Sequence, residues 1–519
     1  MRWQHTLNDC QHRSFAGLYI LLLLNLLIVG CATVPHDIPK AHSTFVTDTS
    51  DTYFGRHAAA WALTHGEASG FLAIGQGMDA LGARLRLLEK AEQTVDLQYF
   101  LMKNDTAGNV VLHALLQAAD RGVRIRFLLD DIFTTTPDKN LLLINQHPNV
   151  EVRLFNPVSR RGFRALNFVG DFRRANRRMH NKSFTADNAV SIVGGRNIAD
   201  EYFQLKDTSV FADFDVVALG PVVGEISASF DDYWNHEMAI PIEQLSPGLE
   251  ANALEEKRAE ISEKSTALYT DIYQNALKSQ LLQDVISGVQ PPFVADAKVM
   301  ADSPEKLVNA IGPEHKKLAG ELRDLVTSAT EEVIIISPYY VPGKNGVELT
   351  RDLVDSGVRV VVITNSLASN NHVPVHSAYG RYRKDIAEMG VELFETRADA
   401  GRFTQEADAP DQFTLHTKLI LIDRRYLFVG SLNMDPRSID INAEMGLLID
   451  SPEMTGDLAD RLDQRLPAMA YKLVVTDKNK LEWHGITDGV EVVETREPQT
   501  SAWLRFKAWL MKIAPESQM

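Results

Sequence analysis

The sequence contains little cysteine, few aromatic residues and no long tract of biased composition. Only two of its 519 residues are cysteines, Cys10 and Cys31, and both precede residue 32. The rest of the chain therefore has no internal disulfide framework. Aromatic residues make up 8% of the sequence, which does not favour a channel or an all-membrane fold. Without a low-complexity tract, its domains are expected to pack together without a flexible tether.

Positive charge is also in deficit, because the formal net charge is −16 at pH 7. Non-specific binding of nucleic acid needs a basic surface, so we predict no nucleic-acid partner. Positive charge does gather in one segment, an arginine cluster that precedes the first motif described below. Its members are Arg160, Arg161, Arg164, Arg173, Arg174, Arg177 and Arg178. The cluster is either a solvated basic face or a mouth that attracts anions, and its position favours the second interpretation.

The first thirty residues have the layout of a signal peptide. Two arginines, Arg2 and Arg13, precede an apolar run at 15–29 that is too short to span a membrane comfortably. The run ends in Ile-Val-Gly-Cys, which resembles the bacterial lipobox, so Cys31 is the predicted lipidation site and first mature residue. An uncleaved anchor is the alternative. Both interpretations attach the protein to a membrane, and lipidation predicts a bacterial envelope lipoprotein that faces the periplasm, in an inner or outer membrane.

The chain is a diverged repeat. Two similar segments, 121–129 and 356–364, lie 235 residues apart. Each follows a helix-like stretch, at 106–120 and 346–355, and each of these follows an apolar, β-branched run. A further strand is expected in each half, at 150–155 and 391–396. The pattern predicts an α/β fold of two similar lobes, each a mostly buried β-sheet flanked by helices, with the active site at the lobe interface.

Six segments follow from this organisation. They are a signal peptide at 1–30, an N-terminal extension at 31–75, a first lobe at 76–250, a helical linker at 251–295, a second lobe at 296–475 and a C-terminal extension at 476–519. The linker ends at Gln290-Pro291-Pro292, which breaks the chain. The C-terminal extension contains an amphipathic helix at 501–513. Packing of its apolar face against the domain is favoured over an interfacial position at a membrane.

One motif occurs in both halves with the same residue types in the same order. The first copy comprises His180, Lys182, Asp187, Gly194, Gly195 and Asn197, and the second comprises His416, Lys418, Asp423, Gly430, Ser431 and Asn433. Both copies read H-x-K-x4-D-x6-G-[GS]-x-N. They lie 236 residues apart, which matches the spacing of the repeat. Five fixed positions that recur in register exclude coincidence.

These residue types suit displacement at a phosphodiester. Residues two apart in a strand point to the same side, so each histidine projects beside its lysine. A neutral imidazole is a suitable nucleophile toward an anionic phosphodiester, and a second imidazole can protonate the leaving alkoxide. The lysines and asparagines would hold the non-bridging oxygens and offset the charge that develops on them. This chemistry needs no metal ion and no other cofactor.

The paired motifs resemble those of the phospholipase D superfamily, and the whole chain is most similar to the bacterial cardiolipin synthases of that type. The resemblance implies two phospholipase D-like lobes, with His180 as the nucleophile and His416 as the acid and base. Gly195 departs from the usual serine, which removes one hydroxyl donor to the phosphate. The motif residues Asp187 and Asp423 are expected to close turns.

Each imidazole also needs a hydrogen-bond acceptor that fixes its tautomer. Glu444 lies 28 residues beyond His416 on an apparent strand, and Asp215 aligns with it in the first half. We expect Glu444 to orient His416 and Asp215 to orient His180.

The resemblance implies a phosphatidyltransferase that forms a phosphohistidine and makes cardiolipin from phosphatidylglycerol and a second phospholipid. A phospholipase D that releases phosphatidic acid is the close alternative. A nuclease or phosphodiesterase is disfavoured by the acidic charge. An inactive, membrane-tethered scaffold is disfavoured because the motif positions are intact in both copies. The sequence indicates a membrane and a phospholipid substrate, and it names no protein partner.

Overall fold

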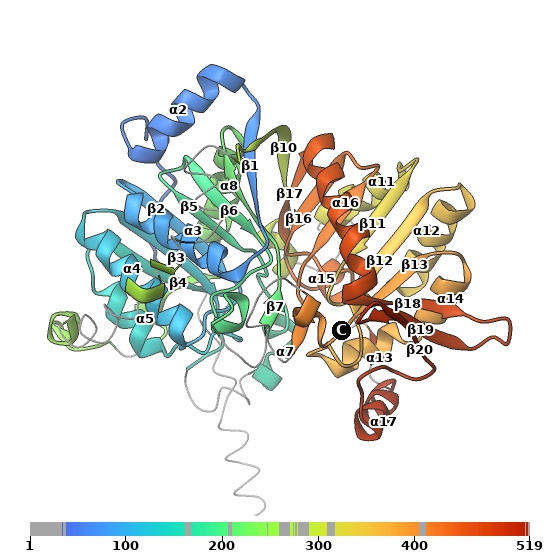
Figure 1. Ribbon diagram of the computed structural model, residues 1–519. Helices are drawn as coiled ribbons and strands as arrows, with labels where there is room; N and C mark the ends of the chain where they lie inside the picture. The colour runs from blue at the N-terminus through green and yellow to red at the C-terminus, as the bar shows by residue number, and fades with distance from the viewer. Residues whose placement is uncertain are drawn as a thin grey trace, which may run out of the picture.

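The computed structural model describes most of the chain between residues 38 and 516 (Figure 1). The described residues are 34, 38–160, 168–205, 210–246, 248–258, 270–272, 274–275, 278, 290–308, 317–403, 412–513 and 515–516. The predicted signal peptide and lipidation site Cys31, most of the predicted linker, and two members of the arginine cluster, Arg161 and Arg164, lie outside them.

The first lobe is a mixed sheet flanked by helices. Its strands are β1 (Ser69–Ile74), β2 (Thr94–Tyr99), β3 (Arg124–Asp130), β4 (Val150–Phe155), β5 (Ser183–Ala186), β6 (Val190–Gly194), β8 (Asp215–Leu219) and β9 (Ala239–Pro241). Its helices are α2 (Tyr53–His65), α3 (Gly77–Lys90), α4 (Thr106–Asp120), α5 (Asp138–Asn145), α7 (Phe172–Ala175) and α8 (Val222–Asn235), with short 3-10 turns η1 (Asp200–Tyr202) and η2 (Ile242–Gln244).

The second lobe has the same design. Its strands are β10 (Phe293–Ala301), β11 (Glu332–Ile336), β12 (Arg359–Asn365), β13 (Glu392–Thr396), β15 (Leu419–Ile422), β16 (Tyr426–Gly430), β17 (Met445–Asp450), β18 (Ala470–Val475), β19 (Leu481–Thr487) and β20 (Val490–Glu494). Its helices are α11 (Lys317–Thr327), α12 (Gly343–Asp355), α13 (Val373–Tyr379), α14 (Arg383–Glu388), α15 (Pro436–Asp440), α16 (Pro452–Met469) and α17 (Ala502–Met511), with 3-10 turns η3 (Pro304–Leu307) and η5 (Ala400–Phe403).

Strand pairing confirms the predicted duplication. The first sheet runs β9, β4, β3, β2, β5, β6, β8, β1, and β2, β3 and β4 are parallel. The second runs β18, β13, β12, β11, β15, β16, β17, β10, and β11, β12 and β13 are parallel. The two orders correspond strand for strand. The strand, helix and strand units expected from the sequence are β2, α4 and β3 in one lobe and β11, α12 and β12 in the other.

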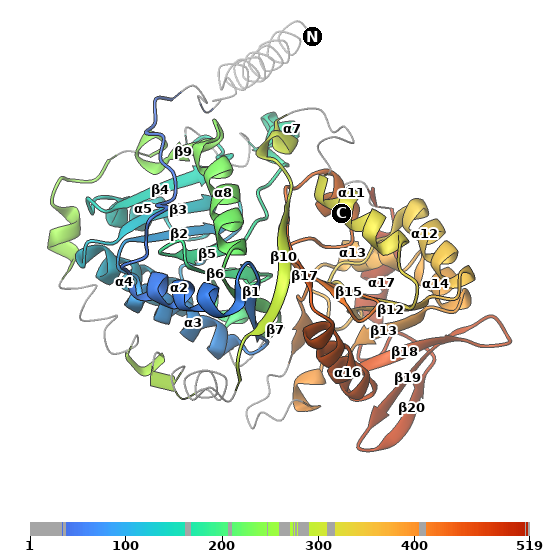
Figure 2. The same cartoon turned by 90° about the horizontal axis from the view of Figure 1, so that it is seen from above.

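The central parallel strands are buried on both faces. β11 and β12 read as nearly continuous hydrophobic runs, whereas β2 and β3 bury a polar pair, Asp96 and Arg126. All residues of β2 and β11 are buried. Helices cover each sheet on both sides, as Figures 1 and 2 show for α8 and α3 in the first lobe. The α/β class and the two-lobe architecture predicted from the sequence are therefore confirmed.

The lobes meet along two antiparallel strands and two short contacts. β1 pairs with β10, and Figure 2 shows β10 lying along the lobe boundary. The short strand β7 (Val210–Ala212) of the first lobe pairs in parallel with β14 (Phe413–Leu415) of the second. Met179 forms an isolated parallel bridge with Ala443. Met179 directly precedes the motif histidine His180, and β14 directly precedes the motif histidine His416. The lobe boundary therefore positions the candidate site.

The C-terminal helix α17 differs from the expectation. Helix formation at 501–513 is confirmed, but its apolar face is largely open to solvent, with Trp503 67% and Trp509 63% exposed. The rings of Trp503, Phe506 and Trp509 stack on one another along that face. Only Ala508 is buried within the helix. The prediction that this face packs against the domain was wrong, because the short helix contacts its lobe through its opposite side. Among the described residues, no helix is long and apolar enough to cross a membrane.

Candidate active site

The two motif histidines lie at the lobe boundary, each hydrogen-bonded by its backbone to the opposite lobe. His180 comes just before β5, and its amide donates to the carbonyl of Ala443 at 2.8 Å. His416 comes just before β15, and its amide donates to the carbonyl of Ala212 at 2.7 Å. Both imidazoles are buried. Each half-site is therefore built on a strand of its own lobe and fixed by the backbone of the other.

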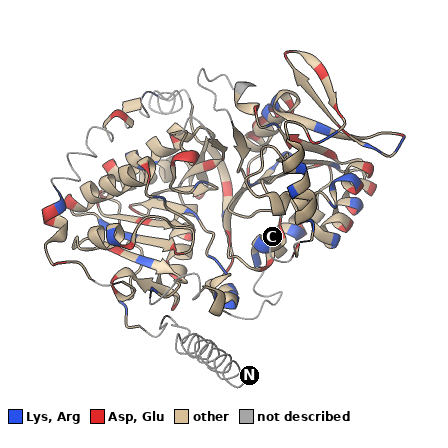
Figure 3. Cartoon of the chain, turned by 90° about the horizontal axis from the view of Figure 1, so that it is seen from below, with Lys and Arg blue, Asp and Glu red and all other residues tan. Residues whose placement is uncertain are grey.

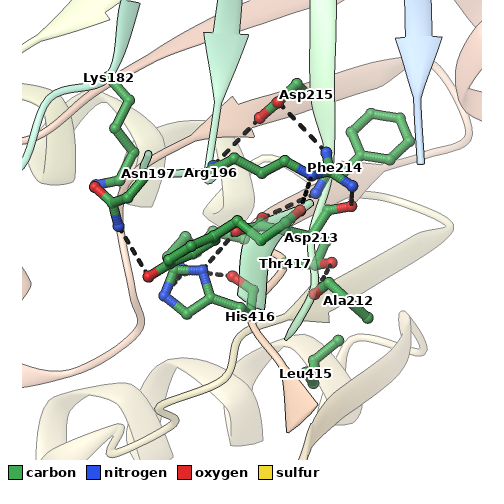
Figure 4. Close-up of polar contacts among 12 residues, drawn as sticks. Lys182, Arg196, Asn197, Ala212, Asp213, Phe214, Asp215, Leu415, His416 and Thr417 are labelled. Atoms are coloured by element: carbon green, nitrogen blue, oxygen red, sulfur yellow. Dashed lines mark hydrogen bonds and ion pairs between the residues drawn. The ribbon is translucent and has the colours of Figure 1, made fainter. Parts of the chain in front are cut away.

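The carboxylate partners of the histidines also come from the opposite lobe. Nδ1 of His180 lies 2.8 Å from Oε2 of Glu444, and Nδ1 of His416 lies 2.5 Å from Oδ2 of Asp213. The expected pairs, Glu444 with His416 and Asp215 with His180, are therefore wrong. Figure 4 shows Asp213 beside His416 and Asp215 turned toward Arg196. A sequence repeat identifies equivalent residues within each lobe, but it contains no information about which lobe completes which half-site.

The register of the sheet explains why Asp213 and not Asp215 is the counterpart of Glu444. Gly194 of β6 lies opposite Asp215 in β8, whereas Gly430 of β16 lies opposite Gly446 in β17. Asp215 thus corresponds to Gly446, and Asp213 corresponds to Glu444. The sequence alignment was off by two residues, a shift that keeps side chains on the same face of a strand and leaves the hydrophobic pattern unchanged.

Asp215 has a structural role in the first lobe. Its carboxylate accepts a hydrogen bond from Arg84 at 2.9 Å and one from the amide of Arg196 at 3.3 Å. All three side chains are buried. Arg196, a variable position of the motif, also donates to backbone carbonyls of Ile74 and Tyr202. This buried ion-pair network holds the loop that carries Asn197.

Both lysines of the motif contact its histidines, and both asparagines are buried. Nζ of Lys182 donates to the carbonyl of His180 at 2.5 Å, and Nζ of Lys418 lies 3.2 Å from Nε2 of His416. Nδ2 of Asn197 donates to the hydroxyl of Tyr202 at 2.9 Å. Within the described part of the chain, the buried Oδ1 of Asn433 has no hydrogen-bond partner. The structure thus places both predicted lysines against the motif histidines, and Asn197 reaches Tyr202, whose ring packs edge-on against His416.

The third motif residue closes a turn in each lobe, as predicted. Asp187 accepts hydrogen bonds from the amides of Glu92, Gln93 and Thr94 at the start of β2. Asp423 accepts the equivalent set from residues 330–332 at the start of β11. Both aspartates have a positive φ, at 49° and 50°. This left-handed conformation is one that aspartate tolerates better than most residues.

Gly195 and Ser431 make the two half-sites unequal. The hydroxyl of Ser431 donates to Oε2 of Glu444, so it supports the carboxylate that holds His180. At Gly195 a Cβ would come within 2.1 Å of Oδ1 of Asp213, so the carboxylate occupies the space of the missing side chain. The expected effect of Gly195, the loss of a donor to the phosphate, is corrected here, because the serine at the equivalent position donates to a carboxylate.

Burial sets the protonation of the histidines. Burial, together with the neighbouring lysines, lowers the pKa of His180 to about 4 and that of His416 to about 3, although the adjacent carboxylates oppose this shift. Burial likewise lowers the pKa of Lys182 to about 7 and that of Lys418 to about 8. Each histidine senses the lysine of the other half-site as well as its own, which places all four groups in one common field. Both imidazoles are therefore neutral at pH 7.

The carboxylates stay ionised despite burial. Burial raises the pKa of Glu444 and of Asp213, but the adjacent histidine and lysine outweigh it, so both values lie below the ordinary range. A neutral histidine whose Nδ1–H donates to a carboxylate carries its lone pair on Nε2. Nε2 is thus the atom that carries the electron pair in each half-site, and at His416 the ammonium of Lys418 lies 3.2 Å from it.

Several residues that support the candidate site are not predictable from the sequence. Asp213 lies two residues before Asp215, and the two-residue period of a strand does not distinguish between them. Asp302 accepts the amide of Glu444 and pairs with the buried Lys306 at 2.7 Å. Asp302 and Lys306 come from the start of the second lobe and carry no motif, so no sequence signal marks them.

The arginine cluster is largely committed to ion pairs in the first lobe. Arg160 pairs with Asp131 and Asp138, Arg178 pairs with Asp130, and Arg174 pairs with Asp171. Arg178 also donates to the carbonyl of Asn156. The expected anion-attracting mouth is therefore wrong for Arg160 and Arg178, because buried aspartates already hold their guanidinium groups.

Comparisons with known proteins agree with this geometry. A family described as "Cardiolipin synthase, PLD-like domain" matches residues 85–234 and 322–466. The chain is 36% identical to cardiolipin synthase C of Escherichia coli (strain K12) over 455 residues, which cover 87% of this chain and 96% of that protein. It is 30% identical to an uncharacterized protein of Helicobacter pylori (strain ATCC 700392 / 26695), over 97% of this chain and all of that one.

Among solved structures, phosphatidylserine synthase of Haemophilus influenzae Rd KW20 matches with a TM-score of 0.52 and 14% identity. The match covers 80% of this chain and 90% of that one. At this identity the likeness concerns the fold alone. The duplicated lobes, the two histidine–lysine–asparagine half-sites at their boundary and the match over most of the chain lead to one conclusion: this protein is an enzyme of the phospholipase D family, similar to the bacterial cardiolipin synthases.

Proposed function

We propose that this enzyme transfers a phosphatidyl group from phosphatidylglycerol to the alcohol of a second phospholipid, making cardiolipin through a phosphohistidine. The observation that carries the proposal is the pair of neutral histidines, each anchored through Nδ1 by a carboxylate of the opposite lobe. Two imidazoles in equivalent settings can divide the nucleophile and acid/base roles between them. The similarity to cardiolipin synthase C over most of both chains supports this choice of reaction.

In the first step Nε2 of His180 attacks phosphorus, and the bond from phosphorus to the headgroup glycerol oxygen breaks. The glycerol oxygen keeps the electron pair of that broken bond and receives a proton from Nε2 of His416, so glycerol leaves. In the second step His416 accepts the proton of the incoming lipid alcohol, whose oxygen attacks phosphorus. The bond from phosphorus to His180 then breaks, which restores the neutral imidazole.

The first step needs a protonated His416, which burial disfavours in the empty site and which the bound substrate would favour. The phosphodiester brings a negative charge into a buried, low-dielectric setting, which favours the charged form of a neighbouring imidazole. Asp213 stabilises the imidazolium through its contact with Nδ1. Glu444 plays the same part for the phosphohistidine at His180.

Four further side chains would bind the non-bridging oxygens. Lys182 and Lys418 bring positive charge, and Asn197 and Asn433 bring amide donors. All four are buried, and interactions with developing negative charge are stronger in a buried site than in water.

Attachment to a membrane is part of the proposal. The exposed aromatic face of α17 has basic residues around it, Arg505, Lys507 and Lys512, a composition that suits the boundary between headgroups and acyl chains. Seen from below, acidic and basic residues are interspersed over both lobes (Figure 3), so general attraction to anionic lipid has little support. A lipidated Cys31 would supply the stable anchor.

The reaction is tested with purified protein in liposomes that contain phosphatidylglycerol. We expect release of glycerol and formation of cardiolipin, with phosphatidic acid as a minor product, and we expect EDTA to leave the activity unchanged. The Lys182→Ala variant, which keeps both histidines, serves as the inactive control. If phosphatidic acid dominates in every lipid mixture, the enzyme is a phospholipase D, which is the second candidate function. Loss of activity in EDTA that a divalent ion restores would contradict the metal-independent mechanism.

The anchor is tested separately in cells. The Cys31→Ser variant should remain an unlipidated and longer precursor, whereas Cys10→Ser should mature normally. Maturation of Cys31→Ser to the wild-type mass, with lipid attached, would show that the lipobox interpretation is wrong.

A further inference from the structure

The two lobes differ in how tightly their first two helices pack. In the first lobe α3 and α4 lie against each other, and eleven residues of α4 are buried. In the second lobe only Thr350 and Leu353 of the equivalent α12 are buried. The space between α11 and α12 is a cavity of about 610 Å³, within the usual range for small-molecule sites, roughly 300–1,000 Å³. The same architecture thus encloses a filled core in one lobe and a cavity in the other.

The wall of this cavity is mainly apolar. It includes Leu322 and Val326 of α11, Leu349 and Leu353 of α12, Ile335 of β11 and Ile420 of β15. The exposed residues Arg323 and Lys344 also line it, so the cavity opens to the surface between the two helices. Such a wall suits an aliphatic chain, because burial of each methylene group contributes about 0.8 kcal/mol, or roughly a fourfold gain in affinity.

The cavity is continuous with the catalytic elements. Ile420 lies two residues beyond Lys418 along an extended chain, so both side chains lie on the same face, about 7 Å apart along the strand. Leu432 and Met434, which flank Asn433, also line the cavity. Tyr340 lines it as well, and its backbone forms a bridge with Met434. The loops that border the cavity are therefore the loops that border the second half-site.

We propose that this cavity binds one acyl chain of the phospholipid whose phosphate lies between the histidines. The inference rests on the proposed function, and it adds a subsite that selects lipids by chain length. The glycerol backbone of the lipid would span the distance from Asn433 and Lys418 to the apolar wall. Because the cavity lies in the second lobe, and the described helices α3 and α4 pack against each other in the first, the site would hold its lipid in one orientation, despite the symmetry of the two half-sites.

Gly320 gives a direct way to close the cavity. It lies on α11 in the cavity wall, and a Cβ added there would meet no atom within 4 Å. A Gly320→Phe side chain can therefore enter the open space without displacing the backbone. Gly320→Ala controls for the change in helix propensity, and Gly456→Phe on α16 adds the same ring at another position where a Cβ meets nothing within 4 Å.

Two measurements on the full-length protein test the proposal. In the first, cis-parinaric acid, a fluorescent long-chain fatty acid, should bind wild type, and Gly320→Phe should weaken its binding by roughly tenfold or more, since the ring excludes several methylene groups. In the second, Gly320→Phe should raise KM for dipalmitoyl phosphatidylglycerol by a similar factor. Turnover of dibutyryl phosphatidylglycerol should stay as in wild type, and both control variants should behave as wild type in each assay.

Leu349→Gln, which places an amide in the cavity wall, gives a second test that does not depend on the bulk of phenylalanine. Chain-length preference that is equal in wild type, Gly320→Phe and Leu349→Gln would overturn the acyl subsite. So would a large drop in the melting temperature of Gly320→Phe alone among the glycine variants, because the cavity would then be filled by the chain itself. If wild type binds cis-parinaric acid at the cavity yet turns over no phospholipid, the proposed function fails while the subsite stands.

Discussion

The two half-sites share one geometry but differ in how each carboxylate is supported. Glu444 is fixed by the hydroxyl of Ser431 and by the pairing of its amide with Asp302, and it holds His180. Asp213 faces Gly195, receives the amide of Phe214, and holds His416. The difference suggests that duplicated lobes can keep equivalent catalytic groups while the surroundings of each group diverge.

Neither lobe contains a complete half-site. Each histidine takes both a backbone hydrogen bond and a carboxylate from the other lobe. Separation of the lobes would leave two buried carboxylates and two imidazoles without their partners. The crossed pairing therefore makes the catalytic geometry depend on the docking of the lobes.

The largest expected effect separates the two histidines. His180→Asn should lower kcat by on the order of 10⁴-fold or more on every phosphodiester, because the nucleophile is lost. His416→Asn should lower kcat by about 10²–10⁴-fold on phosphatidylglycerol, whose alkoxide needs a proton. On a p-nitrophenyl phosphodiester, whose leaving group needs none, the first-step burst of His416→Asn should stay near wild type. The opposite pattern would reverse the two roles.

The crossed carboxylates are tested next. Glu444→Gln and Asp213→Asn should each lower kcat by roughly 10²–10³-fold, since the imidazole loses the acceptor that fixes its tautomer. With the p-nitrophenyl substrate, only Glu444→Gln should slow the first-step burst. Equal slowing of that burst by both variants would contradict the assignment of Glu444 to the nucleophile.

Asp215→Asn is the matched control for Asp213→Asn, since the two aspartates are two residues apart. Its main effect should be on stability, with a loss of about 3 kcal/mol in the free energy of unfolding, because Arg84 and Arg196 would lose a buried partner. Chemical denaturation measures the loss. A kinetic defect as large as that of Asp213→Asn, without destabilisation, would favour the original assignment of Asp215.

Substitutions at Gly195 and Ser431 test the smaller difference between the half-sites, which lies in how each carboxylate is supported. Ser431→Gly should lower kcat about tenfold, the usual effect of removing one hydrogen bond to a charged group, and it should leave KM near wild type. Ser431→Thr, which keeps a hydroxyl, is the control. Gly195→Ser should be more harmful than Ser431→Gly, because its Cβ would collide with Asp213. Tolerance of Gly195→Ser would show that Asp213 can move.

The last prediction concerns the pH dependence of stability. The folded-state pKa values of His180 and His416 lie below the ordinary value of about 6.5, so their neutral forms favour the folded protein above that pH. This stability is lost as the pH falls from 6.5 toward 4, by about 2 kcal/mol per histidine at pH 5. The free energies of unfolding of wild type and of the His180→Asn, His416→Asn double variant, measured by denaturation at each pH, should converge as the pH falls over this range. The same pH dependence of the free energy of unfolding in both proteins would show that the histidines are not buried in neutral form.

The sequence by itself determined the repeat, the α/β class, the motif residues and the turn-closing role of Asp187 and Asp423. Each of these depends on spacing along one chain or on a pattern of apolar residues that a single strand or helix displays. Helix formation at 501–513 was predictable for the same reason.

Only the tertiary structure decided how the halves complete each other. The pairing of Glu444 with His180 and of Asp213 with His416 depends on lobe docking, and a shift of two residues along a strand leaves its hydrophobic pattern unchanged. The exposure of α17, the ion pairs of the arginine cluster and the cavity beside α11 likewise arise from packing between distant segments. The spacing of apolar residues along a helix or strand shows which of its faces is apolar, but it does not show which other segment of the chain covers that face.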